Sequence, residues 1–144
     1  MDAPLSRLVE ATGAIAAGCW RMENETLNLI GFGSVKEMLP EVRQGFQDAT
    51  RKVCLNQTNL GIVQASVSKK PTIAHRDPGQ TGLDGSASWI VKFAASTSLA
   101  VPIFDSCSRT VIGALAISTA AQIRENDELW NKIVYLSELL CTPD

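Results

Sequence analysis

The fold of this chain is decided near its C-terminal end, where residues 98–119 read Ser98-Leu-Ala-Val-Pro-Ile-Phe-Asp-Ser-Cys-Ser-Arg-Thr-Val-Ile-Gly-Ala-Leu-Ala-Ile-Ser-Thr119. Two runs rich in β-branched residues, 97–104 and 109–118, flank a polar turn at 105–108. This pattern predicts an antiparallel hairpin. Asn126 then caps an expected helix with a broad apolar stripe. A hairpin followed at once by a helix indicates a mixed α and β domain.

The residues before this hairpin predict further short helices and strands. Proline suits the first turn of a helix, and apolar residues that recur every three or four positions mark its buried face. The expected elements are a helix after Pro4, a hairpin of 13–22 with 26–32, a helix from Pro40 with the stripe Val42, Phe46, Ala49 and Val53, a short helix from Gly61, a strand at 72–75 and a helix within 86–95.

The composition is that of a globular protein. The chain has 144 residues, of which 45% are hydrophobic and 19% are charged, so it can bury a core. A formal net charge of -2 argues against a nucleic-acid partner. No run of about 18 apolar residues predicts a membrane-spanning helix, and the N-terminus lacks a signal-peptide pattern. Four cysteines without metal-ligand spacing are typical of a reduced, cytoplasmic protein.

Three segments, in order and at the usual spacing, resemble a GAF domain, a small sensory module. They are Leu60-Gly-Ile-Val63 followed by Lys70-Pro-Thr-Ile73, then Ser98-Leu-Ala-Val-Pro-Ile103, then Val111-Ile-Gly-Ala-Leu-Ala-Ile-Ser118. Ile123 departs from the family, which usually has an aromatic residue there. A PAS domain is the competing fold, but the expected terminal helices fit a GAF domain better.

The resemblance implies an α+β fold, with a GAF/PAS-like antiparallel sheet of about five to six strands. The terminal helices would cover one face, and ligand-side helices and loops the other. Residues 1–144 would form a single GAF-like domain. Proline lacks a backbone donor, so Pro102 is expected at a strand edge or a bulge. Gly113 is expected where a helix, a bulge or a ligand approaches closely.

Two groups of residues are candidates for binding a ligand. His75, the single histidine, could contact a ligand, and Arg76 beside Asp77 could hold a carboxylate or a phosphate. The alternative is a solvated strand end that leads into a turn. The second group lies where the family has its pocket lid; its serines could donate hydrogen bonds and its rings could form an apolar wall, or the rings could be ordinary core. This group comprises Ser86, Ser88, Trp89 and Phe93.

The cysteines argue against two known chemistries of the family. Phytochrome-like members attach a bilin to a cysteine that is commonly followed by histidine, whereas Leu55 follows Cys54 and Ser108 follows Cys107. Free-methionine-sulfoxide reductases use a cysteine in the loop region, and this chain has none between 55 and 106. Dispersed carboxylates and one histidine make a poor metal site. We therefore expect no enzymatic activity, and the sequence leaves any cofactor unidentified.

The leading hypothesis is a cytoplasmic sensory domain that binds an unidentified small molecule and relays a signal through its terminal helices to an output domain. The alternative is a ligand-free module that forms a homodimer through those helices. A small reductase-type enzyme is a third hypothesis. The discriminating feature is a cavity over the small residues Ala100, Ala114 and Ala116: an open void lined by Trp89 and His75 favours sensing, and filling by Phe46, Ile73 and Phe93 favours dimerisation.

Overall fold

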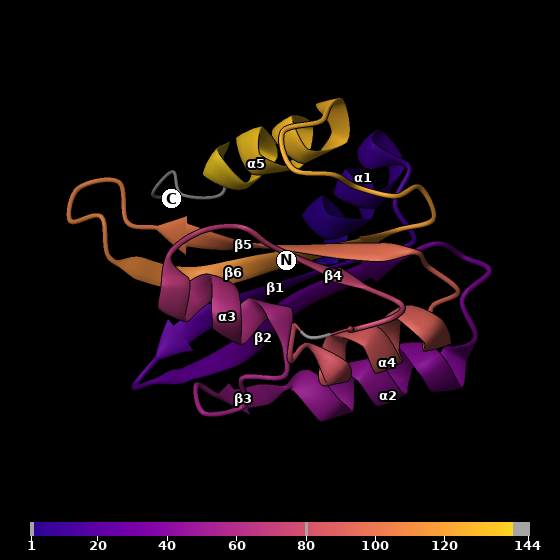
Figure 1. Cartoon of the computed structure of the whole chain (residues 1–144), viewed down its shortest axis with the longest axis horizontal. Helices are drawn as coiled ribbons and strands as arrows, with labels where there is room; N and C mark the ends of the chain where they lie inside the picture. Colours follow the sequence, from indigo (N-terminus) through magenta and orange to yellow (C-terminus); the bar gives the residue numbers. More distant parts are fainter. Residues whose placement is uncertain (1, 80, 140–144) are drawn as a thin grey trace.

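The computed structural model describes residues 2–79 and 81–139 of the chain, which form a curled, six-stranded antiparallel sheet with helices on both faces (Figure 1). The strand order is β3-β2-β1-β6-β5-β4. The expected α+β class is confirmed. The elements are α1 (Asp2–Thr12), β1 (Ala16–Glu23), β2 (Thr26–Ser34), α2 (Pro40–Thr50), β3 (Lys52–Cys54), α3 (Gly61–Ser68), β4 (Thr72–His75), α4 (Asp84–Lys92), β5 (Thr97–Phe104), β6 (Val111–Thr119) and α5 (Glu128–Leu139).

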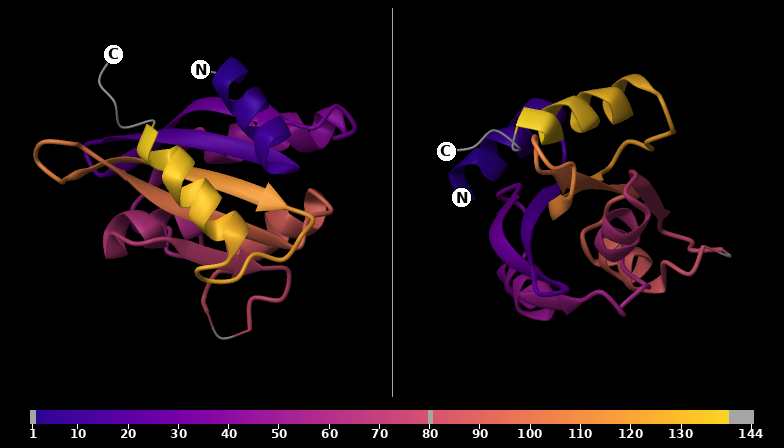
Figure 2. Two further views of the ribbon diagram at one scale, coloured as in Figure 1. Left: turned by 90° about the horizontal axis from the view of Figure 1, so that it is seen from above. Right: turned by 90° about the vertical axis from the view of Figure 1, so that its left-hand side faces the viewer.

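The terminal helices α1 and α5 lie side by side over one face of the sheet, and α2, α3 and α4 lie on the other (Figures 1 and 2). Under the terminal helices the central strands present Ala17, Ile117 and Leu99, which stand directly opposite one another on β1, β6 and β5. They pack into one core with Leu5 of α1 and Ile133 of α5. This face is therefore filled by ordinary apolar packing.

The helix expected to run through Val53 is shorter than predicted. Helix α2 ends at Thr50, and Val53 belongs to the edge strand β3, where it pairs with Leu27 and is 0% exposed. Ala49, placed on the apolar stripe of the helix, is exposed. The spacing of four residues between Ala49 and Val53 fits a continuous helix as well as a helix that ends before a strand. The apolar period therefore could not distinguish these two structures.

The prediction for Pro102 agrees with the structure, and Gly113 lies beside a register shift of β5 and β6 but meets a neighbouring strand rather than a helix or a ligand. Strand β4 pairs with β5 only as far as Ala100, so Pro102 lies where β5 has become an edge strand. Gly113 stands opposite Arg21 of β1, and a Cβ atom there would collide with the backbone carbonyl oxygen of Trp20. The close approach at Gly113 is therefore that of a neighbouring strand.

Helix α5 is capped by Asp127 rather than by Asn126. The backbone N–H of Trp130 donates to Oδ1 of Asp127 at 2.8 Å, and the backbone N–H of Arg124 donates to Oδ2 of Asp127 at 2.8 Å. Asn126 has a positive φ of 66° and precedes the cap. The side chain that satisfies the first turn is thus one residue later than predicted.

We predict that Asp127→Ala lowers the melting temperature at neutral pH, and that the difference from the unaltered chain shrinks in acid. The hydrogen bonds from Trp130 and Arg124 hold the pKa of the Asp127 carboxyl below its ordinary value. The stabilisation is therefore present above the pKa of the unfolded carboxyl and is lost as the pH falls through the lower pKa of the folded one. Thermal unfolding followed by circular dichroism across a pH series measures this. Glu125→Ala is the control, and a pH-independent difference for Asp127→Ala would contradict the prediction.

Candidate ligand-binding site

A partly open cavity of about 40 Å³ lies between the sheet and the helices α2, α3 and α4. Its floor is the sheet face opposite the terminal helices. Residues that pair across antiparallel strands project to the same face, and residues two positions apart along a strand do so as well. Two rows of small side chains result: Ala16, Ser118, Ser98 and Ala74 across β1, β6, β5 and β4, and Gly18, Ala116 and Ala100 across β1, β6 and β5.

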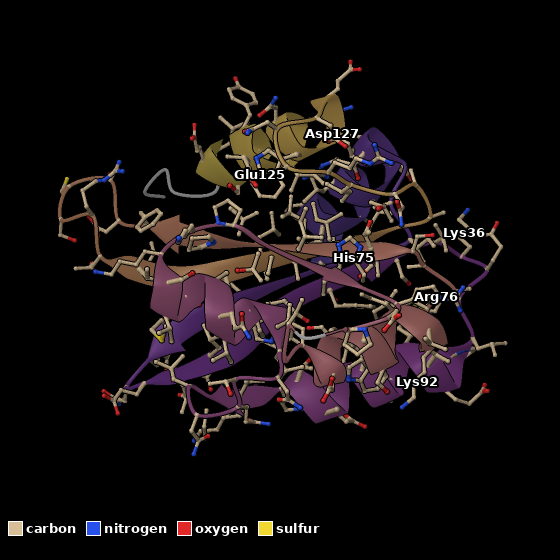
Figure 3. The ribbon with its side chains drawn as sticks, viewed as in Figure 1. Lys36, His75, Arg76, Lys92, Glu125 and Asp127 are labelled. Atoms are coloured by element: carbon tan, nitrogen blue, oxygen red, sulfur yellow. The ribbon has the colours of Figure 1, made fainter. Side chains whose placement is uncertain are left out.

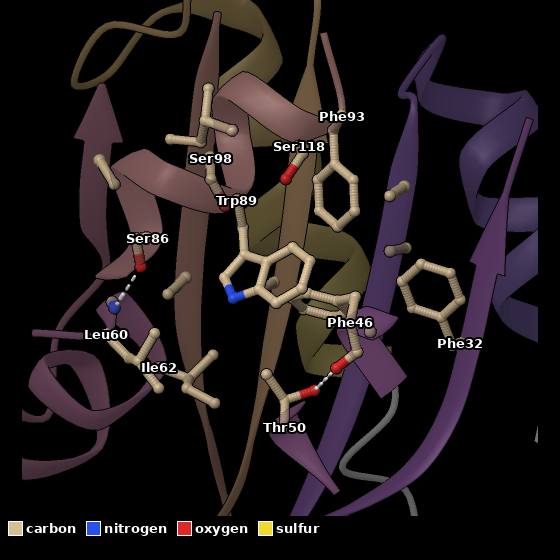
Figure 4. Close-up of a pocket in the computed structure, with 18 of the residues that line it drawn as sticks. Phe32, Phe46, Thr50, Leu60, Ile62, Ser86, Trp89, Phe93, Ser98 and Ser118 are labelled. Atoms are coloured by element: carbon tan, nitrogen blue, oxygen red, sulfur yellow. Dashed lines mark hydrogen bonds between the residues drawn. The ribbon is translucent and has the colours of Figure 1, made fainter. Parts of the chain in front are cut away.

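Aromatic rings from the sheet and the helices face this floor (Figure 4). Phe46 of α2 is their centre, because its ring centroid lies 5.0 Å from that of Phe93, 5.1 Å from that of Trp89 and 5.3 Å from that of Phe32. Trp20 of β1 meets Phe46 edge-on, with centroids 6.1 Å apart. Edge-to-face pairs of this kind stabilise a cluster beyond its buried area. We call these five residues the aromatic cluster.

Two hydroxyl groups of the lining are held by the protein itself. Ser86, at the start of α4, accepts a hydrogen bond from the Gly61 N–H at 2.8 Å and so joins the first turns of α3 and α4. Thr50 donates to the Phe46 carbonyl oxygen at 2.7 Å within α2. Figure 4 shows both bonds as dashed lines. These bonds position the helices over the floor.

The hydroxyl group of Ser118 has no such partner. Ser118 is only 6% exposed and lines the cavity, yet its side chain makes no hydrogen bond to any residue that the structure describes. Ser98, its neighbour on β5, lines the same cavity, and its hydroxyl is likewise unpaired within the described ranges. Neither hydroxyl is sealed from the pocket, so both remain accessible to a molecule that enters it. The serine pair therefore offers hydrogen-bonding capacity that no described residue uses.

The residues predicted at the end of β4 lie outside the cavity. His75, Arg76 and Asp77 are exposed, and none of them lines it (Figure 3). The reason is the alternation of a strand: Ala74 faces the cavity, so His75 projects to the other side. Ser88 is exposed as well.

Helix α4 brings together the other three predicted residues. Ser86, Trp89 and Phe93 stand three and four positions apart, which places them on one helical face, and all three line the cavity. Lys92 lies outside, where its Nζ is 4.3 Å from the centroid of the Trp89 ring, within reach of a cation–π interaction (Figure 3). No ionisable side chain is among the described residues that line the cavity.

Sequence reasoning missed several lining residues. Ser98 and Ser118 both lie in the predicted hairpin, but the turn predicted at 105–108 would have paired Ser98 with Leu115; the register shift between Ile103 and Phe104 places Ser98 opposite Ser118. Phe46 was predicted only as a side chain that could fill the cavity, and Trp20 was not predicted there at all, because the two rings converge only in the tertiary structure. The cavity meets part of each criterion set out for sensing and for dimerisation. Ala100 and Ala116 line an open space, as expected for a sensor, but Phe46 and Phe93 narrow that space, as expected for a ligand-free module.

The cysteines do not contribute to the cavity. Cys19 faces the opposite core, where burial raises the pKa of its thiol to about 11 and so disfavours the reactive thiolate. Cys54 and Cys107 are exposed and line no part of the cavity, and Cys141 lies outside the described residues. In the described part of the chain, no three His, Cys, Asp or Glu residues gather as a metal site. Nor does any helix there combine the length and apolarity needed to cross a membrane.

Comparison with known proteins identifies the fold. No protein-family model matches the chain, and no curated protein matches it in sequence. Among solved structures, a GAF domain/HD domain protein from Geobacter sulfurreducens is 16% identical with a TM-score of 0.68, over 96% of this chain and 86% of that one. The phycocyanobilin-bound GAF domain of a cyanobacterial phytochrome is 11% identical with a TM-score of 0.67, over 96% and 79%. The resemblance drawn from the three sequence segments is confirmed at the level of the fold.

The comparison also corrects the expectation that the chain is not an enzyme. A type II free methionine-R-sulfoxide reductase from Thermoplasma acidophilum is 14% identical with a TM-score of 0.68, and the match covers 98% of this chain and 86% of that enzyme. Structures of this fold therefore include reductases. The fold is compatible with catalysis, and the absence of a cysteine between 55 and 106 was too narrow a ground for excluding it.

Proposed function

We propose that this chain, which has the GAF fold, is a regulatory domain that binds a small molecule in the cavity between its sheet and helices α2 to α4. The observation that carries the proposal is the hydroxyl of Ser118, which lines the pocket and makes no hydrogen bond to a described residue. A ligand group that bonds to this hydroxyl gains a hydrogen bond of about 0.5–1.5 kcal/mol, which favours the bound state.

The same strands connect the cavity to the terminal helices, so binding has a route to the other face. Ser118 of β6 projects into the cavity, and the adjacent Ile117 packs in the core beneath α1 and α5. A ligand shifts the helices only if it has different affinities for two arrangements of them. We propose that α1 and α5 relay this shift to a signalling output domain. The exposed thiols of Cys54 and Cys107 support a reducing location, the cytoplasm.

Native mass spectrometry of the purified chain tests the proposal. We expect a species heavier than the chain by the mass of one small molecule under mild conditions, and the mass of the bare chain after denaturation. Thermal unfolding in the presence of a library of small molecules extends the test to ligands lost during purification, because a ligand that binds only the folded state raises its melting temperature. A bare chain whose melting temperature responds to no compound would contradict the proposal.

A homodimer formed through the terminal helices is a second candidate, favoured by one feature of α5. Tyr135 is 61% exposed and Leu139, four positions later on the same helical face, is 50% exposed, while Trp130, Val134 and Leu136 are only half-buried. Apolar side chains exposed together at a surface often mark interfaces. Dimerisation is compatible with sensing, because both would use α1 and α5.

We predict that Tyr135→Glu weakens such a dimer by about tenfold or more, since a carboxylate in an apolar interface loses its hydration without gaining a partner. Sedimentation equilibrium over a range of concentrations measures the dissociation constant. Ser108→Glu adds the same charge in the exposed turn between β5 and β6, and it should leave the constant unchanged. A chain that is monomeric at all concentrations would exclude this second candidate without affecting the first.

A further inference from the structure

We infer that the ligand of this cavity is an uncharged, flat molecule with one hydrogen-bonding edge, which lies between the serine pair and the aromatic cluster. The inference rests on the proposed function and specifies the chemistry of its ligand. Three features of the lining carry it: the absence of charge, the shape of the two walls and the position of the free hydroxyl groups.

The lining offers no partner for a charged group. None of the described residues that line the cavity has an ionisable side chain, and Lys92 lies outside, against the Trp89 ring. Two backbone donors near the helix N-termini are also engaged, because the N–H of Gly61 donates to the Ser86 hydroxyl and the N–H of Ser86 donates to the carbonyl oxygen of Asn59. An unpaired charge in an apolar site costs several kcal/mol. The cavity therefore selects an uncharged ligand.

The walls favour a flat ligand. Gly18, Ala100 and Ala116 give the floor an even surface without long side chains. Opposite them stand the rings of Phe46 and Trp89. At about 40 Å³ the cavity holds only one to three water molecules. Both Trp89 and Phe46 are half-buried, so their rings are the part of the wall that a larger ligand would displace, and a flat ligand would displace them least.

The serine pair defines the polar edge. Ser98 and Ser118 are directly opposite on β5 and β6, a position in which the Cβ atoms of two residues lie about 4.5–5.5 Å apart. A hydroxyl both donates and accepts, so the pair accommodates a carbonyl oxygen as well as a ring N–H. The rest of the floor, including the alanines on either side of the pair, is apolar. One edge of the ligand is therefore polar and the remainder is not.

Four probes of similar size test the inference by isothermal titration calorimetry. Indole is neutral, flat and has one N–H; indene has the same shape without the N–H; tryptamine carries a positive charge and indole-3-carboxylate a negative one. We expect indole to bind at least about tenfold more tightly than either charged compound, because a desolvated charge without a partner is disfavoured. Indene should bind about two- to tenfold more weakly than indole, the range expected for one hydrogen bond.

Serine variants locate the polar edge. Ser118→Ala should weaken indole by about two- to tenfold and leave indene unchanged, since only indole uses the hydroxyl. If Ser118→Ala unfolds the chain, the affinities of Ser98→Ala for indole and indene provide the same test. Ser88→Ala is the control, because Ser88 is exposed on α4 outside the cavity. Tight binding of tryptamine or indole-3-carboxylate would overturn the inference and leave the proposed function intact. Failure of all four probes, with no small molecule retained by the purified chain, would overturn both.

Discussion

Trp20→Ala is expected to lower the free energy of unfolding by about 3–5 kcal/mol, the range for a buried tryptophan. Trp20 is 1% exposed, and its indole N–H donates to the carbonyl oxygen of Thr50 at 2.9 Å. Its ring folds back over Gly18, where an added Cβ would lie 2.5 Å from the ring atom Cη2. The side chain thus links β1 to the end of α2 and supports Phe46. Urea unfolding followed by circular dichroism measures the change, provided that the dependence on urea remains comparable.

Two further tryptophan variants separate the contributions. Trp20→Phe keeps an aromatic ring beside Phe46 but leaves the Thr50 carbonyl without its donor, and we expect it to cost about 1–3 kcal/mol. Trp130→Ala removes a half-buried ring of α5 on the other face, and its effect should be clearly smaller than that of Trp20→Ala. Equal losses for Trp20→Ala and Trp130→Ala would show that Trp20 has no special structural role.

Ala116→Val is expected to weaken the binding of any ligand in the cavity by roughly 10- to 100-fold. Ala116 lies at the centre of the floor, between Gly18 and Ala100, and two added carbon atoms there would occupy space that is now only about 40 Å³. Overlap in a packed site costs about 1–3 kcal/mol, and 1.4 kcal/mol corresponds to a factor of ten in affinity. Valine is favourable in a strand, so the fold should persist.

The affinity of Ala116→Val is measured with indole or with the molecule that the chain retains on purification. Ala120→Val makes the same substitution at an exposed position just after β6, and it should bind as the unaltered chain does. Unchanged affinity in Ala116→Val, with its melting temperature preserved, would place the ligand elsewhere. A higher melting temperature together with lost binding would show that the floor is kept small for the ligand at the expense of packing.

The fold was predictable where its signals are local. The two runs of the C-terminal hairpin are adjacent in sequence, which made their antiparallel pairing predictable, although a register shift between Ile103 and Phe104 sets the exact partners. The apolar period of α5 and the helix that starts at Pro40 are local as well. Prediction failed at Val53, because burial of that residue against Leu27 depends on strands that are about 26 residues apart in the chain. The N-cap of α5 is Asp127 rather than the predicted Asn126. The prediction missed by one residue because Asn and Asp, which follow one another here, are both favourable N-caps.

The sequence alone therefore determined the order of the elements apart from β3, the alternation that puts small residues on one face of the hairpin and large ones on the other, and the shared helical face of Trp89 and Phe93. Only the tertiary structure decided that His75 projects away from the cavity, that Phe46 and Trp20 close it, and that Ser98 and Ser118 stand together without a partner. The physical reason is that periodicity assigns side chains to faces, whereas a cavity forms where several faces meet, and that meeting depends on packing between segments distant in the chain.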